Sequence, residues 1–422
     1  MDQTIDATQK QPDPESSIID SLGIFEKPVR FLVEGVGIES KNKKFRFGNV
    51  GFWSTVPVYN FVDGFWIGQT FKGYYHFDKR NRLTVEPMVY YTSARKKVIW
   101  QNDITYEYAP DMKGKMVLSM GDVSADYDTE EHLARLENSL YSLVLGRNYM
   151  KLYQKRYVEL KNNFYPLPGF RVFSGFSFQK RRSEVNHTTF SFIKDHDDQE
   201  NIPLNAKFRS MEPNTALVGD VGFDYTICEN CEYNLTSNEI IYSHIPTLSF
   251  RYVFGIPVGN KNRSSFNRVD AALHQRFKFK KTTTLHYKIG MGAFLTKHNL
   301  WFPDFKHFGA YSLPSMRTFT EDGYFLIGYY KADTDRKWLK GSLNFMSEKF
   351  LLTRLKFLSN GDFSEGMHAR YLWTSEISHY TEWGYSVGYK DLVRVGFFIG
   401  FERERYKNFG LSVSFPWLTG GY

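Results

Sequence analysis

Two cysteines, Cys228 and Cys231, stand three residues apart in the stretch CENC. Such a pair can form a loop disulfide, remain as two thiols, bind zinc or carry out redox chemistry. Zinc would need two further ligands at suitable spacing, and His244 supplies at most one. A thioredoxin-like site would need a βαβ pattern around the pair, and the sequence has none. We therefore expect a loop disulfide or two free thiols and no metal site.

Hydrolytic chemistry has one candidate, the stretch NHTTFS at 186–191, in which Asn186 would orient His187. Neighbouring residues of a strand point to opposite faces, which removes most of this case. The acidic run DHDD at 195–198 is typical of a solvated loop, with a weak calcium or lipopolysaccharide-bridging site as the alternative. We expect a protein that is not an enzyme and needs no cofactor.

The composition combines many aromatic residues with a polar average. The chain has 422 residues, 18% of them aromatic, yet its mean hydropathy is −0.44. This combination is expected where one layer of large side chains surrounds a structure whose other face is wet. The net charge of +8 is spread along the chain. Without a recognition motif, this charge does not indicate a nucleic-acid partner.

The sequence contains no run of about 18 consecutive apolar residues, so it predicts no membrane-spanning helix. A closed β-barrel also crosses lipid, because its backbone N–H and C=O groups all find partners within the barrel. The first twenty residues are polar and lack the apolar segment of a secretory signal. An outer-membrane protein with this sequence would be the mature or truncated part of a longer precursor, and a cytosolic protein is the alternative.

Period-two alternation runs through most of the chain. In NFGLSVSFPWL (408–418), Phe, Leu, Val, Phe and Trp alternate with Gly, Ser, Ser and Pro. Strands place such residues on opposite faces. We predict about sixteen strands, with a margin of two, among these segments: 29–38, 65–76, 83–92, 96–109, 114–124, 150–164, 169–182, 214–227, 247–257, 266–279, 285–295, 323–331, 338–346, 349–357, 366–376, 381–390, 393–403 and 408–418.

One segment has helical spacing instead. In 128–146 an apolar stripe is formed by Leu133, Leu136, Leu140, Leu143 and Val144. Asp128 or Thr129 can cap the start, and Gly146 can end the helix. We expect this amphipathic helix to lie in a connection and to pack against a rim or plug. A membrane-surface or partner-docking role is the alternative.

A soluble sandwich and a membrane barrel both show this alternation. Two features favour the barrel. The face opposite the apolar one carries charged residues such as Arg394 and Glu402, which would line a watery lumen, and aromatic residues gather at strand ends. We predict an all-β protein, a transmembrane antiparallel β-barrel at 29–422, after a flexible lead at 1–28.

Several stretches resemble the landmarks of a Bacteroidota outer-membrane family of unknown function. They are PVYNFVDGFWIG (57–68), NYMKLYQKRYVEL (148–160), NHTTFSF (186–192), QRFKF (275–279) and FLIGYYKADTDRKWLKGSLN (325–344). In that family a barrel usually follows a signal peptide and a carboxypeptidase-regulatory-like domain. The resemblance implies a bacterial outer-membrane location. It brings no catalytic residues, because none are established for the family.

A weaker likeness concerns FPDFKHFGAYSLPSMRTFTEDGYFLIGYY (302–330). In the BamA/TamA assembly-factor superfamily, a late loop folds into the lumen and presents an arginine, and Arg317 stands at a comparable distance from the C-terminus. Thr318 replaces the glycine that gives the loop tip its sharp turn there. The alternative is a structured loop in which Arg317 pairs with an interior acid such as Glu402.

These observations leave three hypotheses for function. The chain is a membrane platform for assembly or export of envelope proteins, an outer-membrane channel or uptake pore, or a soluble β-rich binding protein. For the membrane hypotheses, the expected partners are outer-membrane lipid and lipopolysaccharide, together with other envelope proteins. The candidate residues inside the lumen or its loops are Arg317, Arg394 and Glu402.

Overall fold

The structure is a computed structural model. It describes residues 37–42, 44–50, 58–78, 81–130, 133–193, 199–205, 207–208, 211–227, 232–233, 240–242, 245–258, 262–280, 282–310, 319, 323–348, 350–352, 362–390 and 392–415. The predicted boundary at residue 28 lies outside these residues.

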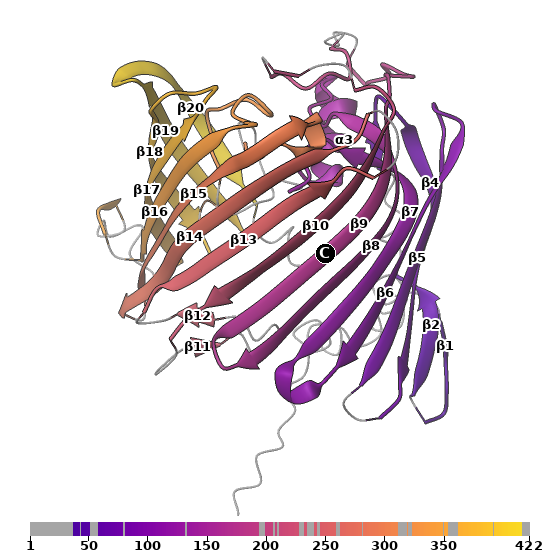
Figure 1. Cartoon of the computed structure of the whole chain (residues 1–422). Coiled ribbons are helices and arrows are strands. Elements are labelled where there is room, and N and C mark those ends of the chain that lie inside the picture. The colour runs from indigo at the N-terminus through magenta and orange to yellow at the C-terminus, as the bar shows by residue number, and fades with distance from the viewer. Residues whose placement is uncertain are drawn as a thin grey trace, which may run out of the picture.

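The described chain is dominated by one antiparallel sheet of eighteen strands (Figure 1). A separate pair is formed by β11 (Glu232–Tyr233) and β12 (Ile240–Tyr242). The strands of the main sheet are β1 (Gly37–Glu39), β2 (Phe45–Asn49), β3 (Tyr59–Asn60), β4 (Gly64–His76), β5 (Arg82–Thr92), β6 (Lys97–Tyr108), β7 (Gly114–Asp126), β8 (Leu152–Leu167), β9 (Phe170–Ser183), β10 (Asn214–Tyr225), β13 (Thr247–Ile256), β14 (Ser265–Lys280), β15 (Thr283–Asn299), β16 (Lys337–Ser347), β17 (Phe363–Thr374), β18 (Tyr380–Tyr389), β19 (Val393–Glu402) and β20 (Arg405–Ser414).

Each long strand pairs with the next one along the chain. From β4 to β10 the pairs are consecutive, β10 pairs with β13, and the order continues from β13 to β20. The hairpin of β1 and β2 joins the other side of β4 through β2. The sheet curls strongly, and in Figure 1 β16–β20 lie at the left, β4–β6 at the right, and β10 and β13 between them. Among the described residues β20 pairs only with β19 and β1 only with β2, so the sheet is not closed there.

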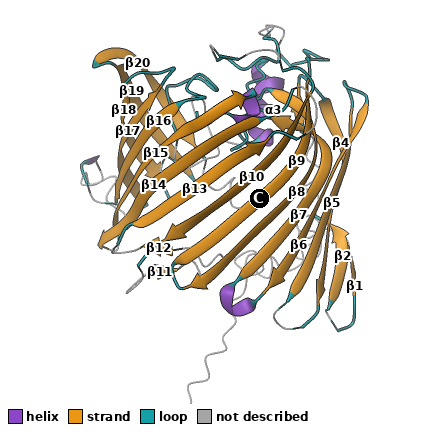
Figure 2. Ribbon diagram, in the orientation of Figure 1, coloured by secondary structure: helices purple, strands orange, loops and turns teal. Residues whose placement is uncertain are grey.

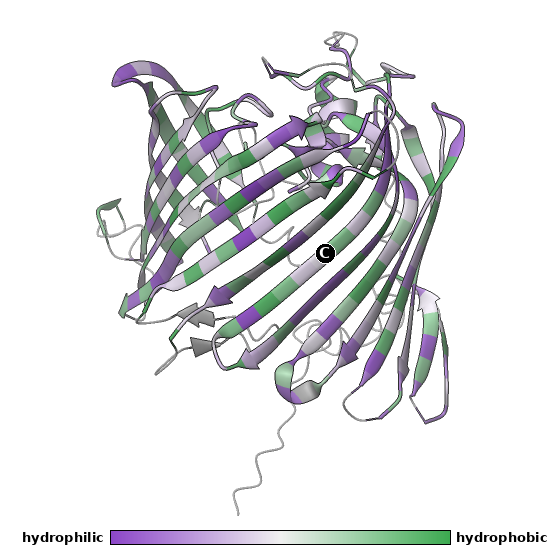
Figure 3. Ribbon diagram, viewed as in Figure 1, coloured by the Kyte–Doolittle hydropathy of each residue, from purple (hydrophilic) through white to green (hydrophobic). Residues whose placement is uncertain are grey.

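The polarity of the sheet is the reverse of that in a soluble protein. On β20 the side chains of Phe409 and Leu411 are 65% and 71% exposed, whereas Ser412 and Ser414 are 2% and 0% exposed. Figure 3 shows hydrophobic and hydrophilic residues alternating along most strands. Soluble proteins place large apolar residues inside and leave serine mostly outside. The outer face of this sheet is therefore apolar, and its inner face is polar.

The connections at the two ends of the sheet differ in length. The three longest, between β7 and β8, between β9 and β10 and between β15 and β16, lie at the end that carries the helix α3 (Arg135–Leu145), as Figure 2 shows. Most connections at the opposite end are tight turns, such as that at 168–169, and two are longer, between β10 and β13 and between β16 and β17. In outer-membrane barrels, short turns face the periplasm and long loops face the outside.

Two short 3-10 helices, η3 (Pro110–Met112) and η4 (Phe302–Asp304), accompany α3. Helix α3 confirms the predicted amphipathic segment but begins later than expected, with Ala134 at its N-cap and no side-chain cap. Gly146 ends it in the left-handed region at φ 63°. Among the described residues no helix is both long and apolar enough to span a membrane.

The predicted apolar stripe of the helix is not its buried face. The buried residues of α3 include Asn138, Ser139 and Tyr141, while Leu140 and Val144 are about half exposed. Asn138 Nδ2 donates to Asn148 Oδ1 at 2.8 Å, and Ser139 Oγ accepts the N–H of Tyr59 at 2.8 Å. A backbone N–H of β3 and a side chain of the connection after α3 are these partners, so the helix buries its polar face against them.

Candidate functional site: the segment inside the sheet

The described residues of the connection from β15 to β16, which are 300–310, 319 and 323–336, fold back inside the curled sheet; we call them the inner segment. Strand formation predicted at 323–331 is wrong, since residues 323–331 contain turns, bends and one isolated bridge. Tyr324, Phe325, Ile327 and Tyr330 are all buried. A strand of this sheet buries one face only, so a segment that buries side chains on several sides cannot remain in it.

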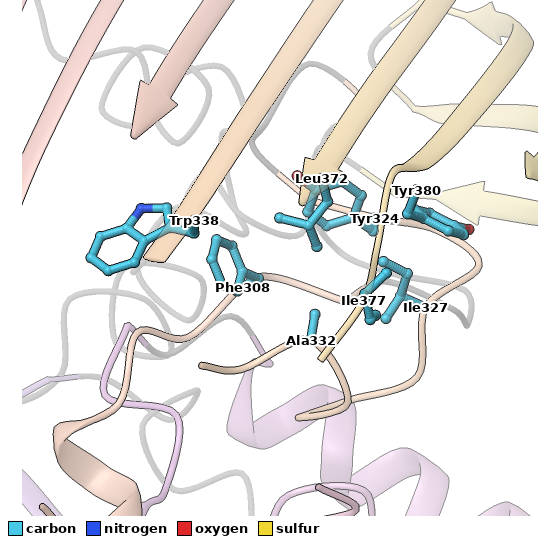
Figure 4. Packing of buried hydrophobic residues seen from close by; sticks show 8 residues of the cluster. All are labelled: Phe308, Tyr324, Ile327, Ala332, Trp338, Leu372, Ile377 and Tyr380. Atoms are coloured by element: carbon cyan, nitrogen blue, oxygen red, sulfur yellow. The ribbon is translucent and has the colours of Figure 1, made fainter. Parts of the chain in front are cut away.

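An apolar cluster joins the inner segment to the sheet (Figure 4). From the segment come Phe308, Tyr324, Ile327 and Ala332; from the strands and the β17–β18 turn come Trp338, Leu372, Ile377 and Tyr380. Tyr324 also donates its hydroxyl to the carbonyl of Tyr371 at 2.9 Å. The cluster supplies the burial that holds the segment against β16–β18.

A buried carboxylate on β18 holds the backbone of the segment. Glu382 accepts the N–H groups of Phe325 and Leu326, both at 2.8 Å, and the hydroxyl of Tyr380 at 2.7 Å. Its side chain is fully buried. Hydrogen bonds to a charged acceptor are the stronger kind, and a buried carboxylate without them would be very costly.

A buried arginine lies directly opposite Glu382 in the register, on β17. Arg370 donates to the carbonyl of Gly323 at 3.1 Å and to that of Phe319 at 2.7 Å. Glu382 therefore accepts backbone N–H groups of the inner segment, and Arg370 donates to its backbone carbonyls. Their opposite charges sit on neighbouring strands, which offsets part of the cost of burying each one.

Three phenylalanines complete this contact. The rings of Phe325 and Phe398 stack with centroids 4.2 Å apart, and Phe319 meets both edge-on at 4.9 and 5.5 Å. Gly384 makes room for the ring of Phe398, because a Cβ there would lie 2.2 Å from the ring. The glycines of the inner face thus allow aromatic rings of the segment and of β19 to approach the backbone.

A second anchor is the buried pair His307–Asp333, both within the inner segment. His307 Nδ1 lies 2.7 Å from Asp333 Oδ2, and Asp333 Oδ1 accepts the N–H of Phe308 at 3.0 Å. Burial lowers the pKa of His307, but Asp333, with further attraction from Asp128 and Glu130, raises it to about 9. Burial also raises the pKa of Asp333, against the attraction of His307. We take His307 as protonated near neutral pH because three carboxylates act on it.

A third anchor lies at the start of the segment. Asp304, in η4, accepts Arg181 Nη1 at 2.7 Å and the hydroxyl of Ser264 at 2.6 Å. Arg181 comes from the inner face of β9, and both charged side chains are almost fully buried. Lys306 pairs with Glu130 in the connection before α3. These contacts tie the segment to the side of the sheet opposite β18.

Tyr330 links the segment to the end of β7. Its hydroxyl donates to Asp126 at 2.7 Å and accepts the N–H of Lys151 at 2.8 Å, while Asn205 Nδ2 donates to its carbonyl at 2.7 Å. Burial and the negative charge of Asp126 raise the pKa of Tyr330 well above its usual value. The hydroxyl therefore stays protonated and keeps donating.

A similar carboxylate cage lies on β17, at the end of the sheet away from α3. Glu365 accepts the N–H groups of Phe350, Leu351 and Leu352 at 3.1, 2.7 and 2.5 Å. Residues 350–352, which belong to the predicted strand 349–357, are therefore not in a strand. The rest of that range lies outside the described residues. The same arrangement, a buried glutamate that accepts backbone N–H groups, thus holds two connections against the sheet.

Of the residues that the sequence proposed for the lumen, the two that the structure describes, Arg394 and Glu402, do not come together. Arg394, at the start of β19, donates to the hydroxyls of Ser386 and Ser364. Glu402 lies at the other end of the same strand and pairs with Lys407. Arg317, Cys228 and Cys231 lie outside the described residues, so the proposed pairing of Arg317 and the state of the cysteine pair stay predictions.

Two weaker sequence candidates can be placed. His187 Nδ1 lies 2.9 Å from the carbonyl of Val62, and Asn186 Nδ2 donates to the carbonyl of Gln199, so Asn186 does not orient the histidine. Within the described ranges, no group of three or more His, Cys, Asp or Glu side chains is arranged to hold a metal ion.

Sequence reasoning missed Glu382, Arg370, Asp304 and the His307–Asp333 pair. Glu382 and Arg370 could have been found from the sequence, because each is a charged residue at an inward-facing position of its strand. A charged side chain buried there requires a hydrogen-bonding or ionic partner. The other three stand in FPDFKHF and KADTDRK, which the sequence marks only as polar interruptions of apolar runs. These charged groups form hydrogen bonds to the backbone of the inner segment and to one another. The site therefore anchors the segment to the sheet.

Comparison with known proteins identifies one matching family and several similar solved structures. Residues 29–387 match the model of the C-terminal domain of a family of unknown function, DUF5686. No curated protein matches the chain. Similar solved structures include BamA from Haemophilus ducreyi lacking POTRA domains 1–3, with TM-score 0.44 and 9% identity over 92% of this chain and 77% of that one.

Two further solved structures are also similar. The outer membrane protein OpdK from Pseudomonas aeruginosa has TM-score 0.38 and 10% identity, and a mutant porin from Rh. blastica has TM-score 0.33 and 9% identity. Each match covers 83% of this chain and 90% of the other. The family match spans well over half of the sequence and confirms the resemblance to a family of unknown function. The chain belongs to the DUF5686 family.

Proposed function

We propose that this chain is an integral protein of the bacterial outer membrane and that it serves as a platform for the assembly or export of envelope proteins. The membrane part of the proposal rests on one observation, the apolar outer face and polar inner face of the sheet. Exposed Phe409 and Leu411 beside buried Ser412 and Ser414 suit hydrocarbon outside and polar contacts inside.

The platform is favoured over an open pore by the inner segment. A diffusion pore needs a water-filled passage along its axis, whereas here Glu382, Arg370 and the apolar cluster hold folded chain against the inner face of β16–β18. A channel remains the second candidate. It requires the segment to leave its anchors, which would break buried hydrogen bonds to charged groups.

The position of β20 at an edge of the described sheet supports the assembly role. Among the described residues, β20 offers an edge without a strand partner. Unpaired edge groups can accept a strand from another chain. A protein that inserts other barrels would use such an edge, while the anchored segment keeps the neighbouring strands in place.

The membrane claim is tested by purification of the full chain with and without detergent. We expect a monodisperse protein in detergent, precipitation or aggregation on its removal, and slower or faster gel migration after boiling. A chain that stays monodisperse in plain buffer would reject this claim and favour the soluble binding protein.

The platform claim is tested by photo-crosslinking in cells. Benzoyl-phenylalanine at Phe409, on the edge strand β20, is expected to capture other barrel proteins. The same label at Leu273, an outward residue of the central strand β14, is the matched control and should capture none. Equal capture at both positions, or none at Phe409, would reject the platform.

The channel alternative is tested in planar bilayers. We expect the native protein to show little conductance, and Glu382→Gln to raise it because the inner segment loses an anchor. Glu365→Gln weakens a cage of the same chemistry on a different connection and serves as the comparison. Large, steady conductance of the native protein would favour the pore over the platform.

A further inference from the structure

A groove of about 430 Å³ lies on the outer wall of the sheet near the α3 end. It is lined by Gln154, Arg156, Lys180, Arg181, Arg182 and 213–215. The side chain of Arg181 faces inward, to Asp304. Because strand side chains alternate, Lys180 and Arg182 on either side of it face outward, and both are exposed.

The register brings these basic groups together across two strands. Lys180 of β9 stands opposite Arg156 of β8, and Arg182 stands opposite Gln154. Arg156 pairs with Asp122 of β7 at 2.7 Å, and Gln154 donates to the same carboxylate. Within the described part of the chain, Lys180 and Arg182 have no carboxylate partner. Three positive charges against one negative charge leave the groove at +2.

The groove adjoins the apolar band of the outer face. On β9 the next outward residues are Phe178 and Phe176, and on β8 they are Val158 and Leu160; all four are exposed. Two residues along a strand span roughly 7 Å. The basic groups thus stand one step beyond the hydrocarbon-facing side chains, at the depth where lipid headgroups lie.

We infer that this groove binds a phosphate of a phosphorylated glycolipid headgroup in the outer leaflet of the membrane. The inference rests on the proposed membrane location and adds a ligand to it. The groove lies at the end with the long connections, which in outer-membrane barrels is the outward end. Arginine offers a planar pair of donors to a phosphate, and lysine adds a point charge.

The test is native mass spectrometry of the full chain released from a neutral detergent, with diphosphorylated lipid A as the probe. Dephosphorylated lipid A, phosphatidylglycerol and inorganic phosphate are the comparison ligands. The test variant is the double change Lys180→Gln and Arg182→Gln. The matched control is Arg403→Gln with Arg405→Gln, which removes the same charge at the same end of the sheet, in the β19–β20 turn and at the first residue of β20.

We expect the native chain and the control variant to bind one diphosphorylated lipid A, and the test variant to bind it about tenfold more weakly. Dephosphorylated lipid A should bind the native chain as weakly, a result that does not depend on any variant. Equal binding by test and control variants, or binding that ignores the phosphates, would overturn the inference. If phosphatidylglycerol or free phosphate bound as tightly as lipid A, and the Lys180 and Arg182 changes weakened that binding too, the glycolipid assignment would be overturned.

The two proposals fail in different ways. If the chain needs no detergent, the membrane location itself is wrong. If the chain stays in micelles and shows heat-modifiable migration, but lipid A binding does not depend on Lys180 and Arg182, only the groove assignment is wrong.

Discussion

Buried glutamates do in this protein what helix caps do elsewhere: they accept backbone N–H groups that have no partner in a regular element. Glu382 and Glu365 each accept two or three such groups and one tyrosine hydroxyl. Because N–H groups surround each carboxylate, burial becomes tolerable. Residues of this kind fix the path of a connection without any regular structure.

Replacing Glu382 by glutamine should therefore cost stability. An amide accepts one of the two N–H groups and presents its own NH₂ to the other, and Arg370 loses the opposing charge. We expect a loss of about 2 kcal/mol in the free energy of unfolding, measured by urea titration in detergent. Glu402→Gln is the control, since its pair with Lys407 is partly exposed and should matter by less than about 0.5 kcal/mol. Equal losses would contradict the anchor.

The His307–Asp333 pair makes stability depend on pH. The pKa of His307 is raised from 6.5 to about 9 by Asp333 and its neighbours, in spite of burial. A raised pKa gives a contribution that is full below pH 6.5 and is lost as pH rises through 9. The upper bound of this contribution is about 3 kcal/mol.

We therefore expect the denaturant concentration at the midpoint of unfolding, measured for the native protein in detergent, to decrease as the pH is raised from 6.5 to 9.5. In His307→Gln the fall should be smaller, because the titrating group is gone. Lys306, whose pKa burial lowers, is present in both chains and cancels in the comparison. An identical fall in the two proteins would show that His307 does not bind its proton as described.

At the scale of elements, the sequence predicted most of the strands closely. The segments 65–76 and 83–92 correspond to β4 (Gly64–His76) and β5 (Arg82–Thr92). Alternation is reliable there because one face must meet an apolar surrounding and the other a polar interior. The short strands β2 and β3 were missed, since they are too brief to establish a period.

The inner segment could not be predicted in the same way. The run from Tyr324 to Tyr330 has the aromatic and aliphatic residues of a strand. Only the tertiary structure shows that Glu382, Arg370 and the rings of Phe319 and Phe398 surround it from several sides. Its anchors come from residues far apart in sequence, which a local pattern does not reveal.

The depth of an outward-facing residue in the bilayer should determine how much free energy of folding is lost when a charged residue replaces it. Leu411 lies away from both ends of β20, whereas Tyr406 is its second residue, next to the β19–β20 turn. Both side chains are highly exposed. Leu411→Lys should cost about 2–4 kcal/mol and Tyr406→Lys about 0–1 kcal/mol. Folding titrations into lipid vesicles would measure both. Equal small costs would place the outer face in water.

At the scale of the whole molecule, eighteen strands form a sheet whose outside is apolar and whose inside is filled near β16–β20 by its own connections. These eighteen strands of the described sheet fall within the margin of two around the predicted sixteen. What the sequence could not predict is that the described part of the sheet leaves β1 and β20 unpaired with each other, because edge pairing depends on both ends of the chain at once.

The most direct test of this account is the lipid accessibility of successive residues of β20 in the reconstituted protein. Spin labels would be placed singly at 409 to 413 in a chain whose Cys228 and Cys231 are replaced by serine. Oxygen collisions should be frequent at 409, 411 and 413 and rare at 410 and 412. No alternation, or alternation of the opposite phase, would contradict a sheet that faces hydrocarbon with Phe409 and Leu411.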